Sequence, residues 1–302
     1  MTFSFIELLA AFGGGVFGAS VGALVAFIFC GFAILCSVSA ILANTHFNLA
    51  LPLALGSFFG PHISFASAVA AAAYAAKKGK LATGKDISSA LMGINDPGTL
   101  LVGGLFGVLG YLLAYVFNII LKPGMTDNVA LTVFIIHVIA RLAFGKTGLF
   151  GEPSEEALER GRFRTGGAAV WVPYQDSWGQ TLTLGLGVSL VNSWIAYKII
   201  KSDPNLALAA TLLGFGISAV KLLFLYTTQV PVTHHITLVS AVATVSSGSI
   251  IWGVVFGIIA ALLGEAFARI FYIHGDTHID PPATSIFTVT TLIYLSKIMG
   301  LF

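Results

Sequence analysis

Long apolar runs constrain this chain more than any other feature. The segments 14–41 and 98–121 contain no charged residue, and each is longer than the roughly 18 residues that cross a bilayer as a helix. Only 9% of the residues are charged and 57% are hydrophobic, whereas soluble domains carry about 25% charged residues. We therefore predict an all-α fold, a polytopic transmembrane helical bundle in contact with the lipid bilayer.

Three pairs of similar segments recur in the same order along the chain. The segments 61–70 (PHISFASAVA) and 234–243 (HHITLVSAVA) share His-Ile and Ser-Ala-Val-Ala without a gap. The other pairs are 98–117 with 248–267 and 127–134 with 280–287. Duplicated halves are typical of membrane transporters, so the pattern favours transport over other membrane functions.

The duplication divides the chain into three regions. We predict a first transmembrane repeat over 1–145, a polar cytoplasmic connector over 146–177 and a second transmembrane repeat over 178–302. In the connector, Pro153 precedes acidic and then basic residues, the order that suits a short helix and its dipole.

About eight helices are expected to cross the membrane, and two segments are expected to be interrupted. One interruption follows from Gly60-Pro61, and the other lies near Thr233, ahead of the short segment 234–246. The expected spanning helices are 14–41, 47–76, 98–121, 127–144, 178–200, 204–226, 248–272 and 281–299.

The distribution of lysine and arginine predicts the orientation. The loop 77–96 and the connector carry most of these residues, and such loops face the cytoplasm. With an even number of crossings in each half, both termini face the cytoplasm and the two repeats run parallel. If either interrupted segment does not cross in this way, the parity changes and the repeats are inverted. A multi-pass protein of the cell membrane is the expected localisation.

The two interruptions are the candidate substrate site. Non-helical backbone inside a bilayer must face protein or water, and the half-helices that follow present their positive ends near mid-membrane. Such ends suit an anionic solute. The candidate substrate-binding residues are Gly60, Pro61, His62, Ser64, Thr233, His234, His235 and Thr237. Alternatively, Pro61 only kinks a helix and the histidines bind neighbouring carbonyl groups.

Asp127 and Asp280 each open a predicted helix, and Asp280 precedes two prolines. Aspartate before the first turn is a common helix cap, so capping is the expected role. The functional alternative is binding of a coupling cation such as Na⁺ or H⁺.

The run 274–280 places His274, Asp276 and His278 close together. Imidazole and carboxylate groups suit a divalent metal, but the run is short, contains glycine and has no second cluster beside it. A polar helix connection is therefore favoured over a metal site, and no cofactor is expected. The sequence also lacks the HExxH, GxSxG and Walker A motifs, which disfavours an enzyme.

The remaining intramembrane charges have structural interpretations. Glu265 and Arg269 are four residues apart and can neutralise each other, and Lys221 can extend to the membrane interface. Gly103 and Gly107 recur as Gly253 and Gly257, a spacing that brings helices close together. Such small-residue faces also suit a homo-oligomer.

The favoured function is a transporter or channel for a small, anionic molecule or ion, bound at the paired helix breaks between the repeats. The alternatives are a non-catalytic subunit of a larger membrane complex and, less favoured, a membrane-embedded metalloenzyme. The formal net charge of +2 gives no indication of nucleic-acid binding.

Overall fold

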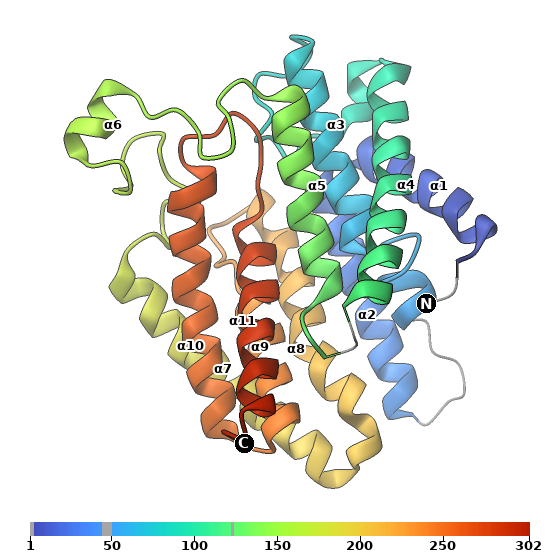
Figure 1. Cartoon of the computed structure of the whole chain (residues 1–302), viewed down its shortest axis with the longest axis vertical. Coiled ribbons are helices and arrows are strands. Elements are labelled where there is room, and N and C mark those ends of the chain that lie inside the picture. The colour runs from blue at the N-terminus through green and yellow to red at the C-terminus, as the bar shows by residue number, and fades with distance from the viewer. Residues whose placement is uncertain (1–2, 44–49, 122–123) are drawn as a thin grey trace.

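A computed structural model describes residues 3–43, 50–121 and 124–302 as a bundle of helices (Figure 1). Five helical segments in these ranges are long and apolar enough to cross a membrane, by length and composition. They are Ala23–Leu42, Pro97–Ile120, Trp178–Ser202, Pro204–Tyr226 and Ile250–Tyr272. The chain is therefore compatible with the expected multi-pass membrane protein.

The first half contains five α-helices and three short helices within the described ranges. Its α-helices are α1 (Phe5–Val21), α2 (Ala23–Leu42), α3 (Ala66–Lys77), α4 (Pro97–Ile120) and α5 (Asn128–Phe144). The short helices are η1 (Ala50–Ala54), η2 (Pro61–Phe65) and η3 (Leu91–Ile94). The break at Gly60-Pro61 is confirmed, because η2 begins at Pro61 and continues into α3. The expected start of this segment at Phe47 lies outside the described residues.

The connector and the second half follow the expected order. The short connector helix is α6 (Glu155–Arg160), which begins after Ser154. The longer helices are α7 (Trp178–Ser202), α8 (Ala207–Lys221), α9 (His234–Ser247), α10 (Ile250–Phe267) and α11 (Pro281–Ile298). The short helices are η4 (Pro204–Leu206), η5 (Leu222–Tyr226) and η6 (Ala268–Tyr272).

The predicted first helix, 14–41, is wrong, because it is divided into α1 and α2 at Gly22. Gly22 has φ 94°, a backbone conformation that glycine adopts without the penalty of a side chain. A Cβ atom here would lie 2.7 Å from the carbonyl oxygen of Ser89. The chain therefore turns at Gly22 and begins α2 in a new direction.

Aspartate caps begin two of the helices that matter for the site. The Asp127 carboxylate accepts a hydrogen bond from the N–H of Ala130 at 2.8 Å, and that of Asp280 accepts one from Ala283 at 2.7 Å. The expected capping role is confirmed for both residues.

Segments that match in sequence run in opposite directions. Lys77 Nζ donates to the Ala143 carbonyl at 2.8 Å, and Lys85 Nζ donates to the Ile273 carbonyl at 3.2 Å. The ends of α3, α5 and η6 therefore lie at one end of the bundle, near the loop 78–96. Figure 1 shows α3 and α5 approaching this end while α9 and α11 leave it. The expected parallel arrangement is wrong, because α9 runs as a helix of its own between α8 and α10. The chain therefore makes one more pass between α4 and α10 than the expected spanning helices provide.

Small residues bring helices together in both halves. Gly103 and Gly107 of α4 pack against the backbone of α1, at Gly15 and Ala11. Gly253 and Gly257 of α10 pack against two serines of α7, Ser193 and Ser189. The expected packing role of these glycines is confirmed.

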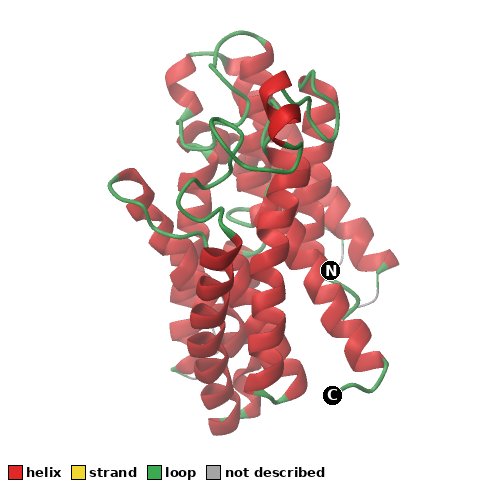
Figure 2. Cartoon of the chain, turned by 90° about the vertical axis from the view of Figure 1, so that its left-hand side faces the viewer, coloured by secondary structure: helices red, strands yellow, loops and turns green. Residues whose placement is uncertain are grey.

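Loops gather at the end of the bundle that holds the loop 78–96 and the connector (Figure 2). The described chain begins and ends away from it. The N–H of Ser4 donates to the Tyr111 hydroxyl at 2.8 Å, in the second half of α4, and the Phe302 ring lies 5.3 Å from Trp252, at the start of α10.

Candidate functional site

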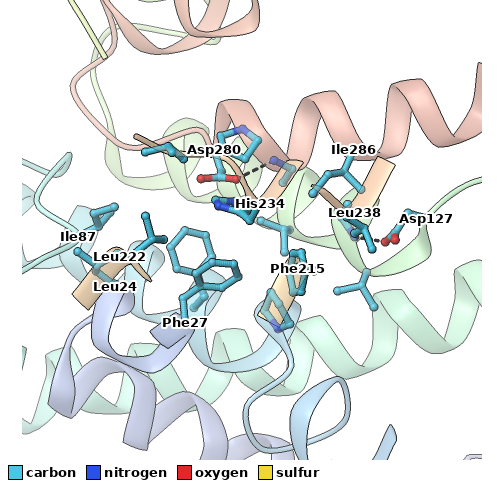
Figure 3. Close-up of a pocket in the computed structure, with 18 of the residues that line it drawn as sticks. Leu24, Phe27, Ile87, Asp127, Phe215, Leu222, His234, Leu238, Asp280 and Ile286 are labelled. Carbon is cyan, nitrogen blue, oxygen red and sulfur yellow. Dashed lines mark hydrogen bonds between the residues drawn. The ribbon is translucent and has the colours of Figure 1, made fainter. Parts of the chain in front are cut away.

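A cavity of about 480 Å³ lies between the two halves of the bundle. Its walls come from α2, η2, α5, α8, α9 and α11, together with parts of the loop 78–96 and of the connector. Most of the lining is apolar, and His234, His278, Asp127 and Asp280 are among its few polar groups. Figure 3 shows Ile87 and Leu24 toward one end of the cavity and Asp127 toward the other, with His234 and Asp280 between them.

Both interrupted segments reach this cavity. Pro61, the first residue of η2, and His234, the first residue of α9, line it. Phe27 of α2 lies between them, because its ring is 4.8 Å from the His234 ring and 5.6 Å from that of Phe65, at the end of η2. The structure thus brings the two breaks together around one space.

The other candidate residues at the breaks do not line the cavity. His62 and Ser64 are buried, the first against Gly110 of α4 and the second against Gly18 of α1. His235 is buried beside Gly264 of α10. Gly60 and Thr233 precede the half-helices, and Thr237 packs against Ser218 through a 3.3 Å hydrogen bond. Of the eight candidates, the cavity lining therefore includes Pro61 and His234.

Lys221 lies at the start of α9, next to the second break. Its ammonium group donates to Thr233 Oγ1 at 2.6 Å, and Thr233 Oγ1 donates to Ser218 Oγ at 3.1 Å. Lys221 is partly exposed, and its ammonium group bonds to the hydroxyl group at the start of α9. The extension of Lys221 to the membrane interface stays a prediction. No carboxylate lies within 4.0 Å of Lys221 among the described residues.

Asp127 and Asp280 line the same cavity and make reciprocal contacts between α5 and α11. The N–H of Asp127 donates to Thr290 Oγ1 at 3.0 Å, and the N–H of Asp280 donates to His137 Nδ1 at 3.2 Å. The Asp280 carboxylate also accepts a hydrogen bond from His278 Nε2 at 3.1 Å. Sequence reasoning missed His137, although it follows Asp127 by the same interval that separates Thr290 from Asp280.

The three side chains considered as metal ligands have separate partners. His274 Nε2 contacts the Arg162 carbonyl at 2.6 Å, and Asp276 accepts a hydrogen bond from Thr147 at 2.9 Å. His278 pairs with Asp280 instead. No group of three histidine, cysteine or acidic side chains in the described part of the chain is placed to hold a metal ion.

Arg141 holds the connection between η6 and α11 in place. Its guanidinium group is fully buried and donates to Thr277 Oγ1 at 2.8 Å and to the carbonyl groups of Thr277, Phe271 and Leu149. A Cβ atom on Gly275 would collide with this guanidinium group. Arg141 therefore fixes the backbone that carries His278 and Asp280.

Two further charged groups lie near the loop-rich end. Arg269 Nε pairs with the Glu265 carboxylate at 2.8 Å, which confirms the expected neutralisation. Lys85 Nζ lies 4.6 Å from the centre of the Tyr272 ring. Burial and, to a smaller extent, the positive charge of Arg141 lower the pKa of Lys85 to about 8, and Asp276 opposes this change.

Comparison with known proteins places the chain in a family without assigning it an activity. No curated protein and no solved structure matches it. One family model matches residues 1–302, and its description is a family of unknown function, DUF7973. The match covers the whole sequence, so the chain belongs to the DUF7973 family.

Proposed function

We propose that this protein transports a small, anionic solute across the membrane, through the cavity between its two halves. The observation that carries the proposal is the convergence of Pro61, His234, Asp127 and Asp280 on one cavity. Its volume of about 480 Å³ lies within the range of small-molecule sites, which are mostly apolar with a few polar groups.

The proposal includes an inverted duplication of the two halves. α1 packs on α4 as α7 packs on α10, and α3 packs on α5 as α9 packs on α11. The reciprocal bonds from Asp127 to Thr290 and from Asp280 to His137 relate the two halves in the same way. Inverted repeats that enclose a site near the membrane midplane, formed by interrupted helices, are typical of secondary transporters.

The start of α9 supports an anionic group on the solute. The N–H groups of His234 and His235 have no acceptor in the described part of the chain, and free N–H groups at a helix start attract anions. Lys221 adds a positive charge there, and its ammonium group makes one hydrogen bond to the described residues. His234 is 7% exposed, lines the cavity and leaves Nδ1 without a partner.

The rest of the cavity supports an apolar body on the same solute. Phe27, Phe215, Leu238 and Ile286 line the walls around His234 and Asp280 (Figure 3). Burial of apolar surface contributes about 25 cal/mol per Å², whereas a small inorganic ion would gain nothing from these walls. We therefore infer an organic acid, such as an aromatic or medium-chain carboxylate.

The arrangement of basic residues favours one orientation. The loop 78–96 and the connector lie at one end of the bundle, and both ends of the described chain lie away from it. Lysine and arginine loops face the cytoplasm, so we infer that Phe302 lies on the opposite side, whereas the sequence predicts a cytoplasmic C-terminus. A reporter fused after Phe302 and active only outside the cytoplasm tests this assignment.

Uptake of radiolabelled carboxylates into proteoliposomes tests the function. Two tryptophan substitutions on α8 form a matched pair, because Leu212 lines the cavity and is 4% exposed whereas Ile217 is 52% exposed on the outer face. We expect Leu212→Trp to block the cavity and abolish uptake, and Ile217→Trp to leave it intact. Size-exclusion profiles verify that both variants fold.

Two results would contradict the proposal. Equal uptake by the two folded variants would show that the solute does not pass through this cavity. If none of benzoate, octanoate and smaller carboxylates is taken up, the assignment of an organic acid as the solute is contradicted.

A further inference from the structure

Three polar side chains meet where α5 approaches the start of α11. They are His137 of α5, His278 of the connection after η6, and Asp280, the cap of α11. We propose that these three residues bind a proton and that their protonation favours binding of the anionic solute in the adjacent cavity. This inference rests on the proposed transport function and assigns the coupling ion at the same site.

The hydrogen bonds of the cluster leave two nitrogen atoms unused. His278 Nε2 donates to the Asp280 carboxylate, and Nδ1 of the same ring is buried without a partner. His137 Nδ1 accepts the N–H of Asp280, so the proton of the neutral ring lies on Nε2, which is also buried without a partner. Buried polar atoms are rarely left unpaired. The cluster therefore has both a free acceptor and a free donor, on rings whose centres are 5.6 Å apart.

Protonation has a simple balance in this cluster. A proton adds to the lone pair of His278 Nδ1, one N–H bond forms and no other bond breaks. With His278 neutral, the pair with Asp280 carries one negative charge; with His278 protonated, the pair is neutral. The Asp280 carboxylate stabilises the protonated ring, because an opposite charge at hydrogen-bond distance favours the charged form.

Charged and titratable groups around the cluster determine how it acts on the cavity. His234 of α9 lies on the cavity wall with Asp280, and Tyr272 of η6 packs its ring 5.3 Å from that of His278. Arg141, one turn beyond His137, is bound to the backbone around Thr277. Lys221 contacts Thr233, beside His234.

This arrangement couples the proton to the solute. An anion at the start of α9 meets the negative charge of Asp280 across the cavity when His278 is neutral. Proton uptake removes that net charge, so the proton and the anion each favour the binding of the other. Coupling of this kind is reciprocal, and it predicts tighter anion binding at lower pH.

Asp127 provides a matched control for Asp280. Both residues cap a helix and line the cavity, but Asp127 contacts Thr290 where Asp280 contacts His137, and its carboxylate is not paired with a histidine in the described structure. Asparagine caps helices about as well as aspartate. Asp280→Asn and Asp127→Asn therefore preserve the caps and differ in whether they remove the charge next to His278.

Hydrogen–deuterium exchange at the C2 position of histidine, followed by mass spectrometry, reports protonation without a solute. We expect exchange at His278 to titrate in the purified full-length protein. We expect Asp280→Asn to shift this pH dependence to lower pH, and Asp127→Asn to leave it unchanged. Absence of titration at His278, or an equal midpoint in the wild type and Asp280→Asn, would overturn the proposal.

Binding of radiolabelled benzoate between pH 5.5 and 8.5 tests the coupling. We expect the apparent Kd of the wild type to rise up to tenfold per pH unit above the midpoint, and Asp280→Asn to abolish this slope. A slope that persists in Asp280→Asn would overturn the coupling. Uptake that does not depend on pH would contradict the proton coupling but not the transport function. Binding that depends on pH without any uptake would contradict the transport function but not the coupling. If benzoate does not bind, the exchange measurement decides the proton site.

Discussion

The two helix breaks share a position in the fold but differ in chemistry. The first begins at Pro61, which has no N–H to offer, and its neighbours Phe27 and Phe65 are aromatic. The second begins at His234, where free N–H groups lie next to the ammonium group of Lys221. The fold therefore brings two similar segments to one cavity, and the polar groups that suit an anion belong to the second.

The two capping aspartates differ in the same sense. Asp127 contacts a threonine of the other half, and Asp280 contacts His137 and pairs with His278. The polar side chains with unpaired or titratable groups therefore lie at two places. Lys221 and His234 lie at the start of α9, and Asp280 with its two histidine partners lies at the start of α11. The helix packing is therefore similar in the two halves, whereas the histidine–aspartate pair belongs to the second half and His137 is the residue of the first half that contacts it.

The largest expected effect comes from removing the charge at the second break. Lys221→Met should weaken benzoate binding at least 100-fold, about 2.8 kcal/mol at 1.4 kcal/mol per tenfold change, because truncating one member of a buried charge pair costs 2–5 kcal/mol. Lys198→Met, at an exposed position on α7, is the matched control and should bind normally. Scintillation proximity binding measures both.

Lys221→Gln separates the charge from the local hydrogen bond, because glutamine can still donate to Thr233. Binding by Lys221→Gln should be as weak as in Lys221→Met. Normal binding in either variant would remove the distinction between the two breaks as anion sites.

A smaller effect is expected from the glycines that pack behind the breaks. A Cβ atom on Gly110 would collide with the backbone carbonyl of His62, whereas one on Gly264 would lie 2.8 Å from the side-chain atom Nε2 of His235. Backbone cannot move aside as easily as a ring, and overpacking costs typically about 1–3 kcal/mol. Replacing glycine by alanine within a helix returns about 1 kcal/mol.

Gly110→Ala should therefore lower the free energy of unfolding by about 2 kcal/mol, and Gly264→Ala by less than about 1 kcal/mol. Thermal unfolding of the two variants in the same detergent measures the difference. Equal losses would indicate that the backbone at His62 is no more constrained than the side chain of His235.

The sequence predicts the parts of this fold that depend on local chemistry. Apolar runs mark the helices, Pro61 marks a break, and the aspartates mark helix starts, because each acts through its own residue or the next turn. The split at Gly22 was missed because a glycine within a small-residue run has two uses, close packing and a turn. The direction of the second half has a separate cause, because the short segment 234–246 forms a further pass, α9, between α8 and α10.

The candidate site was predicted only where similarity between the halves indicated it. Pro61 and His234 were found through the repeated segment, but His137 is a lone histidine in an apolar helix and belongs to no motif. Its role depends on α11 packing against α5, which the sequence does not reveal. The hydrogen bond from Lys221 to Thr233 likewise depends on α8 lying beside the start of α9, which the sequence does not reveal.

The smallest expected effect concerns the loops that join corresponding helices. The second half connects α9 to α10 through two residues, whereas the first half inserts the loop 78–96, whose Lys85 reaches the Ile273 carbonyl beside the connection that carries His278. Burial lowers the pKa of Lys85 to about 8, so about half of its amines are neutral at pH 8, against less than about 1% for an ordinary lysine. Competitive acylation at pH 8, analysed by mass spectrometry, should give Lys85 a lower apparent pKa than the exposed Lys78.

The unfolded chain binds the Lys85 proton more tightly than the folded chain, so the folded protein gains stability as the pH rises from about 8 toward 10.5. Lys85→Met should remove that part of the pH dependence. Identical stability profiles for the wild type and Lys85→Met would mean that the inserted loop is not held against the second half at this residue.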